Sequence, residues 1–328
     1  MQIAITGSIA TDHLMTFEGL FADSLVVEQL DKISLSFLTQ DLQVRRGGVA
    51  ANIAFGMASL GQRPILVGAV GEDFTDYRSW LERHGVDCHS VHYSESHHTA
   101  RFICTTDQDM AQIATFYAGA MTEARDIELA PVADRVGGLD LVVIGANDPI
   151  AMQRHSEECR SRGIPFAADP SQQLAFLDGD GIAGLIDGAE YLFTNEYEAA
   201  IACQKTGWSE DDLADRVRVQ VKTQGKDGVT VRVRGEEPVH VGAAREVRKA
   251  DPTGVGDAFR AGFLTGLAAD LPVRRCAELG SMLATYVIET VGTQEYSVRK
   301  ADFLKRLAEA YGDESADEVG PHIECERP

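Results

Sequence analysis

The chain has 328 residues, of which 44% are hydrophobic and 25% are charged. No apolar run reaches the roughly 20 residues that a membrane-spanning helix needs, so we expect no membrane partner. The formal net charge of −21 disfavours nucleic acid as a partner. It would also repel a phosphorylated ligand unless the binding site supplies local positive potential.

The N-terminal segment and the cysteines bear on the cellular compartment. The first residues lack the basic start and long apolar stretch of a secretory signal, so we expect a cytoplasmic protein. The six cysteines lack the close spacing of metal ligands, which predicts reduced thiols and no zinc site. The histidines between His84 and His98 also lack the helical spacing of a metal site.

Six apolar, β-rich runs alternate with stretches of helical spacing. The expected strands are residues 3–5, 64–67, 139–144, 166–168, 191–193 and 217–221. The expected helices include residues 49–60, 74–83, 151–162 and 213–217, the last preceded by a capping box of Ser209 and Asp212. This alternation predicts an α/β fold with a mainly parallel central sheet flanked by helices, in which ligands bind beyond the carboxyl ends of the strands.

Two stretches, at about residues 13–45 and 98–118, break this pattern. They carry short alternating segments, and the second contains the turn-like sequence Asp107-Gln108-Asp109. We therefore expect one α/β domain over residues 1–312, with a small β-sheet lid formed by the two stretches. Residues 313–328 are acidic and show no helical or strand period, which predicts a disordered tail.

The most informative segment is Gly254-Val255-Gly256-Asp257, at the start of an expected helix. Glycines let a backbone approach a ligand closely, and a helix start offers unpaired N–H groups with a positive dipole end. These amides can hold an anion, and the Asp257 carboxylate can accept a proton from an attacking hydroxyl. Taken alone, a plain glycine turn explains the segment equally well, because it lacks the Walker and dinucleotide-binding patterns.

The same segment resembles the second signature of the PfkB, or ribokinase-like, carbohydrate kinases. Three further motifs of this family occur in order, namely Gly7 to Asp12, Gly47-Gly48 with Asn52, and Asn195-x-x-Glu198. The resemblance covers nearly the whole chain and implies a ribokinase-like kinase that uses ATP and Mg²⁺. Val255 stands where alanine is usual and Pro252 is atypical, but backbone amides would make the anion hole.

The resemblance also implies a role for each motif. The amides of Gly254, Val255 and Gly256 would form the anion hole, and Asp257 would be the catalytic base. Asp12 would accept hydrogen bonds from two vicinal hydroxyls of a ribose. The remaining residues implied to hold the sugar are Gly47, Gly48 and Asn52. Without the resemblance, Asp12 is equally well explained as a helix or turn cap.

On the nucleotide side, the resemblance implies that Asn195 and Glu198 organise the water shell of Mg²⁺, with no direct protein ligand to the metal. The residues implied to border ATP are Thr223, Gly225 and Gly228. The alternatives are a helix cap for the first pair and a strand-to-strand turn for the second group. A monovalent cation such as K⁺ is further suggested near residues 251–253 and 292–294.

The acceptor must be inferred from the lid and from one unusual segment. Phe102 and Phe116 occupy strand positions in the two arms of a predicted hairpin, and Met121 follows, so a purine beneath the lid would find aromatic faces. Both phenylalanines could instead fill the core of the lid or a dimer contact. Gln172 and Gln173 stand in a segment where many sugar kinases of this family carry Asp-x-Asn-x-Arg.

Glutamine amides can pair with the edge of an adenine, whereas the missing arginine weakens the case for a phosphorylated sugar. With Ser8 in the first motif and the segment 292–295, the chain resembles the bacterial adenosine kinases of this family. That resemblance implies transfer of the ATP γ-phosphoryl group to the 5′-hydroxyl of adenosine, giving AMP and ADP. A sugar kinase and a non-catalytic nucleoside-binding regulator remain the alternatives. Open strand edges in the lid suggest a homodimer.

Overall fold

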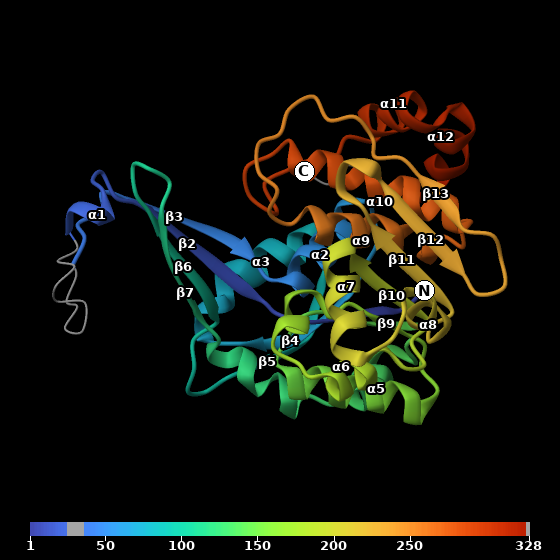
Figure 1. The fold of residues 1–328 in the computed structure, drawn as a ribbon, viewed down its shortest axis with the longest axis horizontal. Coiled ribbons are helices and arrows are strands. Elements are labelled where there is room, and N and C mark those ends of the chain that lie inside the picture. The colour runs from blue at the N-terminus through green and yellow to red at the C-terminus, as the bar shows by residue number, and fades with distance from the viewer. Residues whose placement is uncertain (25–35, 326–328) are drawn as a thin grey trace.

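The computed structural model describes residues 1–24 and 36–325. Within them, a nine-stranded sheet forms the centre of the fold in the order β13-β12-β11-β10-β9-β8-β1-β4-β5 (Figure 1). From β11 to β5 neighbouring strands are parallel, whereas β12 and β13 are antiparallel. The strands are β1 Ile3–Thr6, β4 Ile65–Val70, β5 Asp87–Tyr93, β8 Leu141–Ile144, β9 Phe166–Ala168, β10 Tyr191–Asn195, β11 Val219–Thr223, β12 Val229–Val233 and β13 Val239–Val241.

Helices cover both faces of the sheet because alternate strand residues point to opposite sides. Ile3 and Ile5 pack into one hydrophobic core, whereas Ala4 between them packs into the other. The first core is closed by α2 Val49–Ser59, α3 Thr75–His84, α9 Val255–Ala268, α10 Val273–Ile288 and α11 Lys300–Tyr311. The second core is closed by α4 Leu129–Val136, α5 Pro149–Arg162, α6 Gly179–Ile186, α7 Glu196–Thr206 and α8 Glu210–Asp215. The predicted α/β class with a mainly parallel sheet is thus confirmed.

Several helix boundaries differ from the expectation by one to three residues, and α8 is the clearest case. The capping box of Ser209 and Asp212 is present, and it starts α8 at Glu210. The helix ends at Asp215, two residues before the expected end at Val217, because Val217 is itself a core residue that leads into β11.

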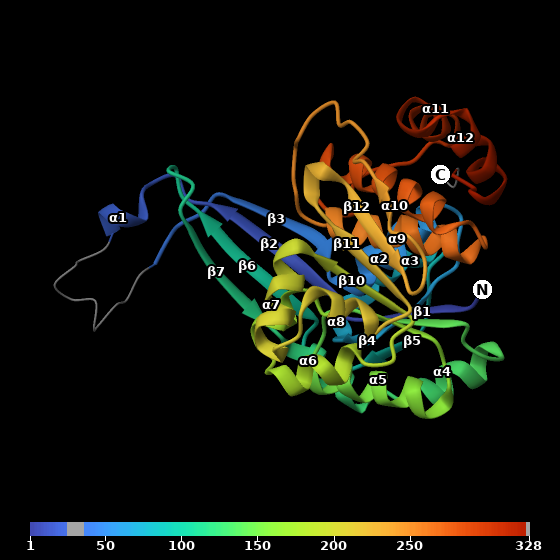
Figure 2. The same cartoon turned by 45° about the vertical axis from the view of Figure 1, so that its right-hand side comes forward.

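The lid is a second sheet in the order β3-β2-β6-β7, which projects from the body in Figure 2 with α1 Phe21–Ser24 at its far end. Its strands are β2 Ala10–Thr16, β3 Asp41–Gly47, β6 Ala100–Thr106 and β7 Gln112–Tyr117. β2 and β6 are parallel, and the other pairs are antiparallel. The predicted hairpin is present, with Phe102 opposite Phe116. The part of the predicted lid at residues 25–35 lies outside the described residues.

The expectation of a disordered tail is wrong for residues 313–325. This segment forms α12 Asp313–Val319 and a 3₁₀ turn at Gly320–His322, and it buries Val319 and Ile323 in the first core. Two of its acidic side chains pair with α10, where Arg275 forms ion pairs with Glu314 at 3.3 Å and Glu318 at 2.8 Å. A seven-residue helix is too short to show a clear period, so composition dominated the prediction.

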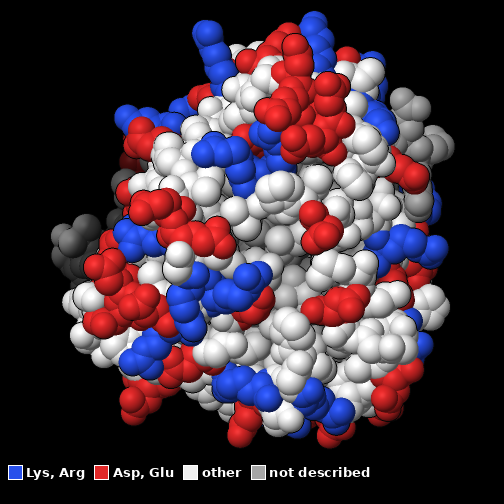
Figure 3. Space-filling view, turned by 90° about the vertical axis from the view of Figure 1, so that its right-hand side faces the viewer, with Lys and Arg blue, Asp and Glu red and all other residues white. Residues whose placement is uncertain are grey.

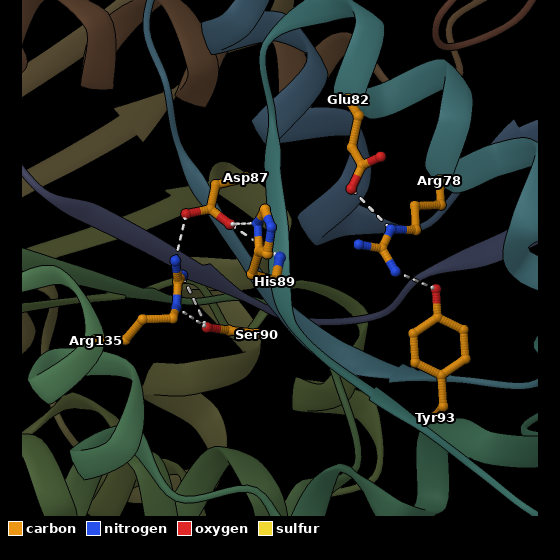
Figure 4. A network of polar contacts seen from close by, with 7 residues as sticks. All are labelled: Arg78, Glu82, Asp87, His89, Ser90, Tyr93 and Arg135. Atoms are coloured by element: carbon orange, nitrogen blue, oxygen red, sulfur yellow. Dashed lines mark hydrogen bonds and ion pairs between the residues drawn. The ribbon is translucent and has the colours of Figure 1, made fainter.

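The edge strand β5 is tied to the helices beside it (Figure 4). Arg135 of α4 donates to Asp87 at 2.7 Å and to Ser90, while Arg78 of α3 donates to Glu82 and contacts the Tyr93 hydroxyl. Charged side chains along an edge discourage pairing with another strand.

Acidic and basic side chains are interspersed over the face that Figure 3 shows. None of the helices in the described part of the chain combines the length and apolar character required to cross a bilayer.

Candidate active site

Two cavities lie at the carboxyl edge of the central sheet. We call the larger one, of about 520 Å³, the acceptor cavity, and the smaller one, of about 340 Å³, the donor cavity. The predicted residues that line the acceptor cavity are Ser8, Asp12, Gly47, Gly48, Asn52, Phe102, Phe116, Met121, Gln172, Gln173, Gly254 and Asp257. Those that line the donor cavity are Asn195, Thr223, Gly225, Gly228, Val255 and Gly256.

The start of α9 separates the two cavities. Gly254 and Asp257 face the acceptor side, and Val255 and Gly256 face the donor side. The helix has no side-chain cap. The Val255 N–H donates to the Pro252 carbonyl oxygen at 3.4 Å, whereas no residue in the described ranges accepts a hydrogen bond from the N–H of Gly256 or Asp257. Unpaired amides at a helix start carry partial positive charge, so this partition can hold an anion that both cavities reach.

Asp257 is held by a hydrogen bond from α2. Asn52 Nδ2 donates to Asp257 Oδ2 at 2.8 Å. Burial raises the pKa of Asp257 above that of an ordinary carboxyl, while the bond from Asn52 and the charge of Arg260 oppose the rise. A carboxylate with a raised pKa is better matched to accepting a proton near neutral pH.

A buried polar network fixes Asn52 in turn. Its Oδ1 accepts from Thr293 Oγ1 at 3.0 Å and from Gln294 Nε2 at 2.9 Å. Gln294 Nε2 also lies 2.6 Å from the Tyr77 hydroxyl, which donates to the Gly47 carbonyl at 2.9 Å. Asn52 therefore orients Asp257. Only one of the two N–H donors on Asn52 Nδ2 remains for a ligand, so Asn52 is not solely a sugar-binding residue, as the sequence had suggested.

The acceptor cavity is roofed by one row of lid residues. Asp12, Phe102 and Phe116 are neighbours across β2, β6 and β7, and Arg45 pairs with Asp12 from β3. Burial raises the pKa of Asp12 to about 6, with Arg45 lowering it and Asp251 raising it. Phe116 keeps 52% of its surface exposed although it faces a cavity, as expected for a side chain that a ligand covers.

Opposite this row, the turn Ser171–Ala175 presents Gln172 and Gln173 to the same cavity. Lys205 of α7 anchors the turn, because its Nζ donates to the carbonyls of Leu174, Ala175 and Leu177 at 2.7–2.8 Å. Phe176 follows, lines the cavity and is 80% exposed. Aromatic side chains thus reach the cavity from both the lid and the body.

The donor cavity combines small apolar residues with lysines. Ala243, Ala244 and Ala284 line it together with Lys226 and Lys249. At Gly228, with φ +93°, a Cβ atom would lie 2.1 Å from the Val241 carbonyl oxygen, so glycine is required there. Lys226 supplies local positive potential in an otherwise acidic chain, whereas Lys249 forms an ion pair with Glu246, another lining residue, at 3.3 Å.

Comparisons with known proteins agree with this arrangement. The family model described as pfkB family carbohydrate kinase matches residues 20–301. The chain belongs to this family. It is a phosphotransferase, and the non-catalytic alternative is set aside.

Two relatives of this PfkB family kinase are nucleoside kinases by name. That of Methanothermobacter thermautotrophicus is 32% identical over 270 residues, which cover 81% of this chain and 85% of the relative. The Burkholderia thailandensis nucleoside kinase in complex with inosine is 34% identical and has a TM-score of 0.83, with 94% of this chain and 99% of that one covered. A ribokinase from Thermotoga maritima, at 19% identity and a TM-score of 0.75, shows the shared fold.

The residues present fit a magnesium ion held through water rather than by a protein cage. Asn195 and Glu198 form a capping box, in which Asn195 Oδ1 accepts from the Glu198 amide at 2.8 Å and Glu198 Oε2 accepts from the Asn195 amide at 2.7 Å. Among the described residues no group of three metal-ligating side chains is present. Mg²⁺ binds largely through water and phosphate oxygens, so Asn195, which lines the donor cavity, would contact its water shell, and the ion would supply charge neutralisation. Glu198 fits the helix-cap alternative instead, because it lines neither cavity.

Sequence reasoning missed several cavity residues. Arg45 lies two residues before Gly47, and Phe176 follows Gln173 by three residues, but neither matches a motif. Lys249 reaches the donor cavity from a segment without regular structure. Glu198 is not among the residues that line either cavity, and its carboxylate instead approaches Arg260.

Gly254→Ala tests the anion-holding helix start. Gly254 has φ +77°, and a Cβ atom would lie 2.9 Å from Thr293 Cγ2, so the loop must shift and the amides must move. We expect kcat to fall about 10²-fold, as when one oxyanion donor is lost. Gly207→Ala is the matched control, because Gly207 has φ +76° with open space around it. Equal kinetic losses in the two variants would contradict the assignment.

Proposed function

We propose that this kinase transfers the γ-phosphoryl group of ATP to the 5′-hydroxyl of adenosine, giving ADP and AMP. The observation that carries the proposal is the partition at the start of α9, where unpaired amides lie between two cavities and Asp257 faces the acceptor side. A phosphoryl group bound at those amides would lie between its donor and its acceptor.

The chain's own groups suffice for the proton transfer. Asp257 takes the proton of the 5′-hydroxyl while the oxygen forms a bond to the γ-phosphorus. The bond from that phosphorus to the β,γ-bridging oxygen breaks, and its electrons stay with ADP. The amides of Gly254, Gly256 and Asp257 stabilise the oxygens of the transferring group, and Lys226 offsets part of the charge of the polyphosphate.

The form of the acceptor cavity supports a nucleoside over a bare sugar. Asp12 and the glycine pair lie next to Asn52 and Asp257, which suits a ribose, while Phe102, Phe116 and Phe176 form an aromatic region beyond. A ribose without a base would leave these rings exposed. Gln172 and Gln173 offer amides to the base edge, and two relatives are named nucleoside kinases.

An acceptor screen tests this proposal. Adenosine, inosine and ribose are supplied with ATP and Mg²⁺, and ADP release is measured. We expect adenosine to give the highest kcat/KM and ribose to fall at least about 10²-fold lower, because ribose makes none of the base contacts. Inosine is the sharper comparison, because its base edge differs from adenine in donors and acceptors. A preference for inosine or ribose would contradict the adenosine assignment and leave the kinase assignment intact.

Asp257→Asn tests the catalytic base. We expect a loss in kcat of about 10²-fold or more, because the amide cannot accept the proton. In the unmodified enzyme kcat/KM should fall as the pH drops and Asp257 becomes protonated, at a pH above the usual carboxyl range. The exposed Asp76→Asn is the control. Near-normal turnover of the Asp257 variant would contradict the assignment.

We further propose that two copies associate through the outer lid face, defined by Met15, Leu42, Val44, Ile103 and Ile113. Cross-strand pairing puts these residues on the side away from the acceptor cavity, and Leu42, Val44 and Ile113 are exposed. Two copies related by a two-fold axis can bury this apolar face against the same face of the partner.

Val44→Asp should convert the dimer to a monomer, measured by sedimentation at micromolar protein, because it places a charge at the contact. Met110→Asp, at the exposed turn between β6 and β7, is the control and should leave the dimer intact. An unmodified protein that sediments as a monomer would contradict this part of the proposal.

A further inference from the structure

A buried group of three charged residues lies behind the start of α9. We call Arg260, Asp169 and Glu198 the buried ion cluster. Arg260 Nη2 lies 2.5 Å from Asp169 Oδ1 and 3.9 Å from Glu198 Oε2. Arg260 is 6% exposed and Asp169 is fully buried. Charged side chains are rarely buried unless they are paired, because removing them from water costs free energy. We therefore asked what function this cluster serves.

The cluster joins the elements that build both cavities. Asp169 follows β9 and begins the segment that carries Gln172 and Gln173 to the acceptor cavity. Glu198 lies in the first turn of α7 and caps it together with Asn195 of the donor cavity. Arg260 lies on α9 three residues after Asp257, so all three segments meet at one guanidinium.

The Arg260 side chain runs back towards the start of its helix. A Cβ atom on Gly256, four residues earlier, would lie 2.9 Å from Arg260 Nη1, so the guanidinium covers the very turn that carries the unpaired amides. Nη1 makes no hydrogen bond to a described residue, and Nε and Asp169 Oδ2 are buried without a hydrogen-bond partner there. Asp169 therefore fixes one side of the guanidinium, and the other side lies against the helix start.

The surroundings of Asp257 contain more negative than positive charge. Glu198 of α7 and Asp169 after β9 act on it, Tyr296 is a further titratable neighbour, and Arg260 supplies the opposing charge. Asn52 of α2 contributes a neutral donor. The acceptor cavity adds Asp12 and Asp251 against Arg45. Burial raises the pKa of Asp169 to about 7, and Arg260 lowers it.

We propose that Arg260 is a positioning residue whose charge keeps Asp257 ionised and holds Asp169 and Glu198 in place as phosphate binds beside them. Arg260 is not the base. Its charge stabilises the ionised form of Asp257, and its guanidinium packs against the turn of α9 that carries Asp257. The inference rests on the proposed function in that Asp257 is taken as the proton acceptor. A buried ion pair that merely stabilises the fold is the alternative that the experiment must separate.

Arg260→Met tests the inference in the full-length enzyme with whichever acceptor the unmodified protein phosphorylates. We expect kcat to fall about 10²-fold, with the KM values for acceptor and ATP within about threefold. The acid limb of kcat/KM should move to higher pH by about one unit, since losing a nearby cation disfavours the ionised carboxylate. A folded variant with kcat within threefold and an unmoved limb would overturn the inference.

Two further variants keep the test decisive if Arg260→Met folds poorly. Arg260→Lys retains the charge, so the acid limb of kcat/KM in this variant should lie near that of the unmodified enzyme. Arg260→Met combined with Asp169→Asn removes both partners of the buried pair, which proteins tolerate better than the loss of one. The acid limb of the double variant should move to higher pH by less than that of the single variant, because Asp169→Asn also removes a negative charge that acts on Asp257. A limb that moves equally in the Lys variant would show that charge is not the cause.

Arg275→Met provides the matched control. Arg275 is also a paired arginine with little exposure, at 11% of its side chain, and lies 2.9 Å from Glu278, but it is at the contact between α10 and α12. We expect it to lower the melting temperature while leaving the pH profile unchanged. Unchanged kinetics in Arg260→Met together with a loss in Asp257→Asn would overturn this inference alone. Full activity of Asp257→Asn would overturn the base assignment and this inference with it.

Discussion

The unpaired amides at the start of α9 constrain the site more than any other feature. They carry partial positive charge in a chain whose net charge is −21, and no side chain caps them. These amides lie between two cavities, so an anion bound to them can be reached from both cavities. Transfer of a phosphoryl group from one bound molecule to another requires such an arrangement.

Much of the surrounding structure orients groups towards this helix start. A chain of hydrogen bonds from Gly47 through Tyr77, Gln294 and Asn52 ends on Asp257. On the other side, the buried ion cluster fixes the same helix against β9 and α7. Buried hydrogen bonds and ion pairs restrict the side chains that they join, so these two networks can hold a base and an anion site in a fixed relation.

The central fold and much of the site could be predicted because their signals are local. Strand alternation, capping residues and glycines with special backbone angles are each readable from a few neighbouring positions. Gly254 and Asp257 are such cases. Phe176 and Lys249 were missed because they reach the cavities through tertiary structure, without a motif of their own. Arg260 was missed for the same reason, because its significance depends on Asp169, 91 residues earlier in the chain.

The tail shows a different kind of failure. Its composition is that of a disordered segment, but pairing with Arg275 and burial of Val319 and Ile323 order it. Asn195 and Glu198 both cap α7, but only Asn195 also lines the donor cavity, while the Glu198 carboxylate approaches Arg260. Local sequence patterns specify helices and strands. Ion pairs between distant elements then decide which of their side chains reach the cavities and which do not.

A structure with adenosine and a non-hydrolysable ATP analogue bound together would test the central claim most directly. The account predicts adenosine in the acceptor cavity, the polyphosphate in the donor cavity, and the terminal phosphate on the amides of Gly254 to Asp257. The 5′-hydroxyl should lie about 3 Å from an Asp257 carboxylate oxygen. A terminal phosphate bound away from those amides, or a sugar hydroxyl out of reach of Asp257, would contradict it.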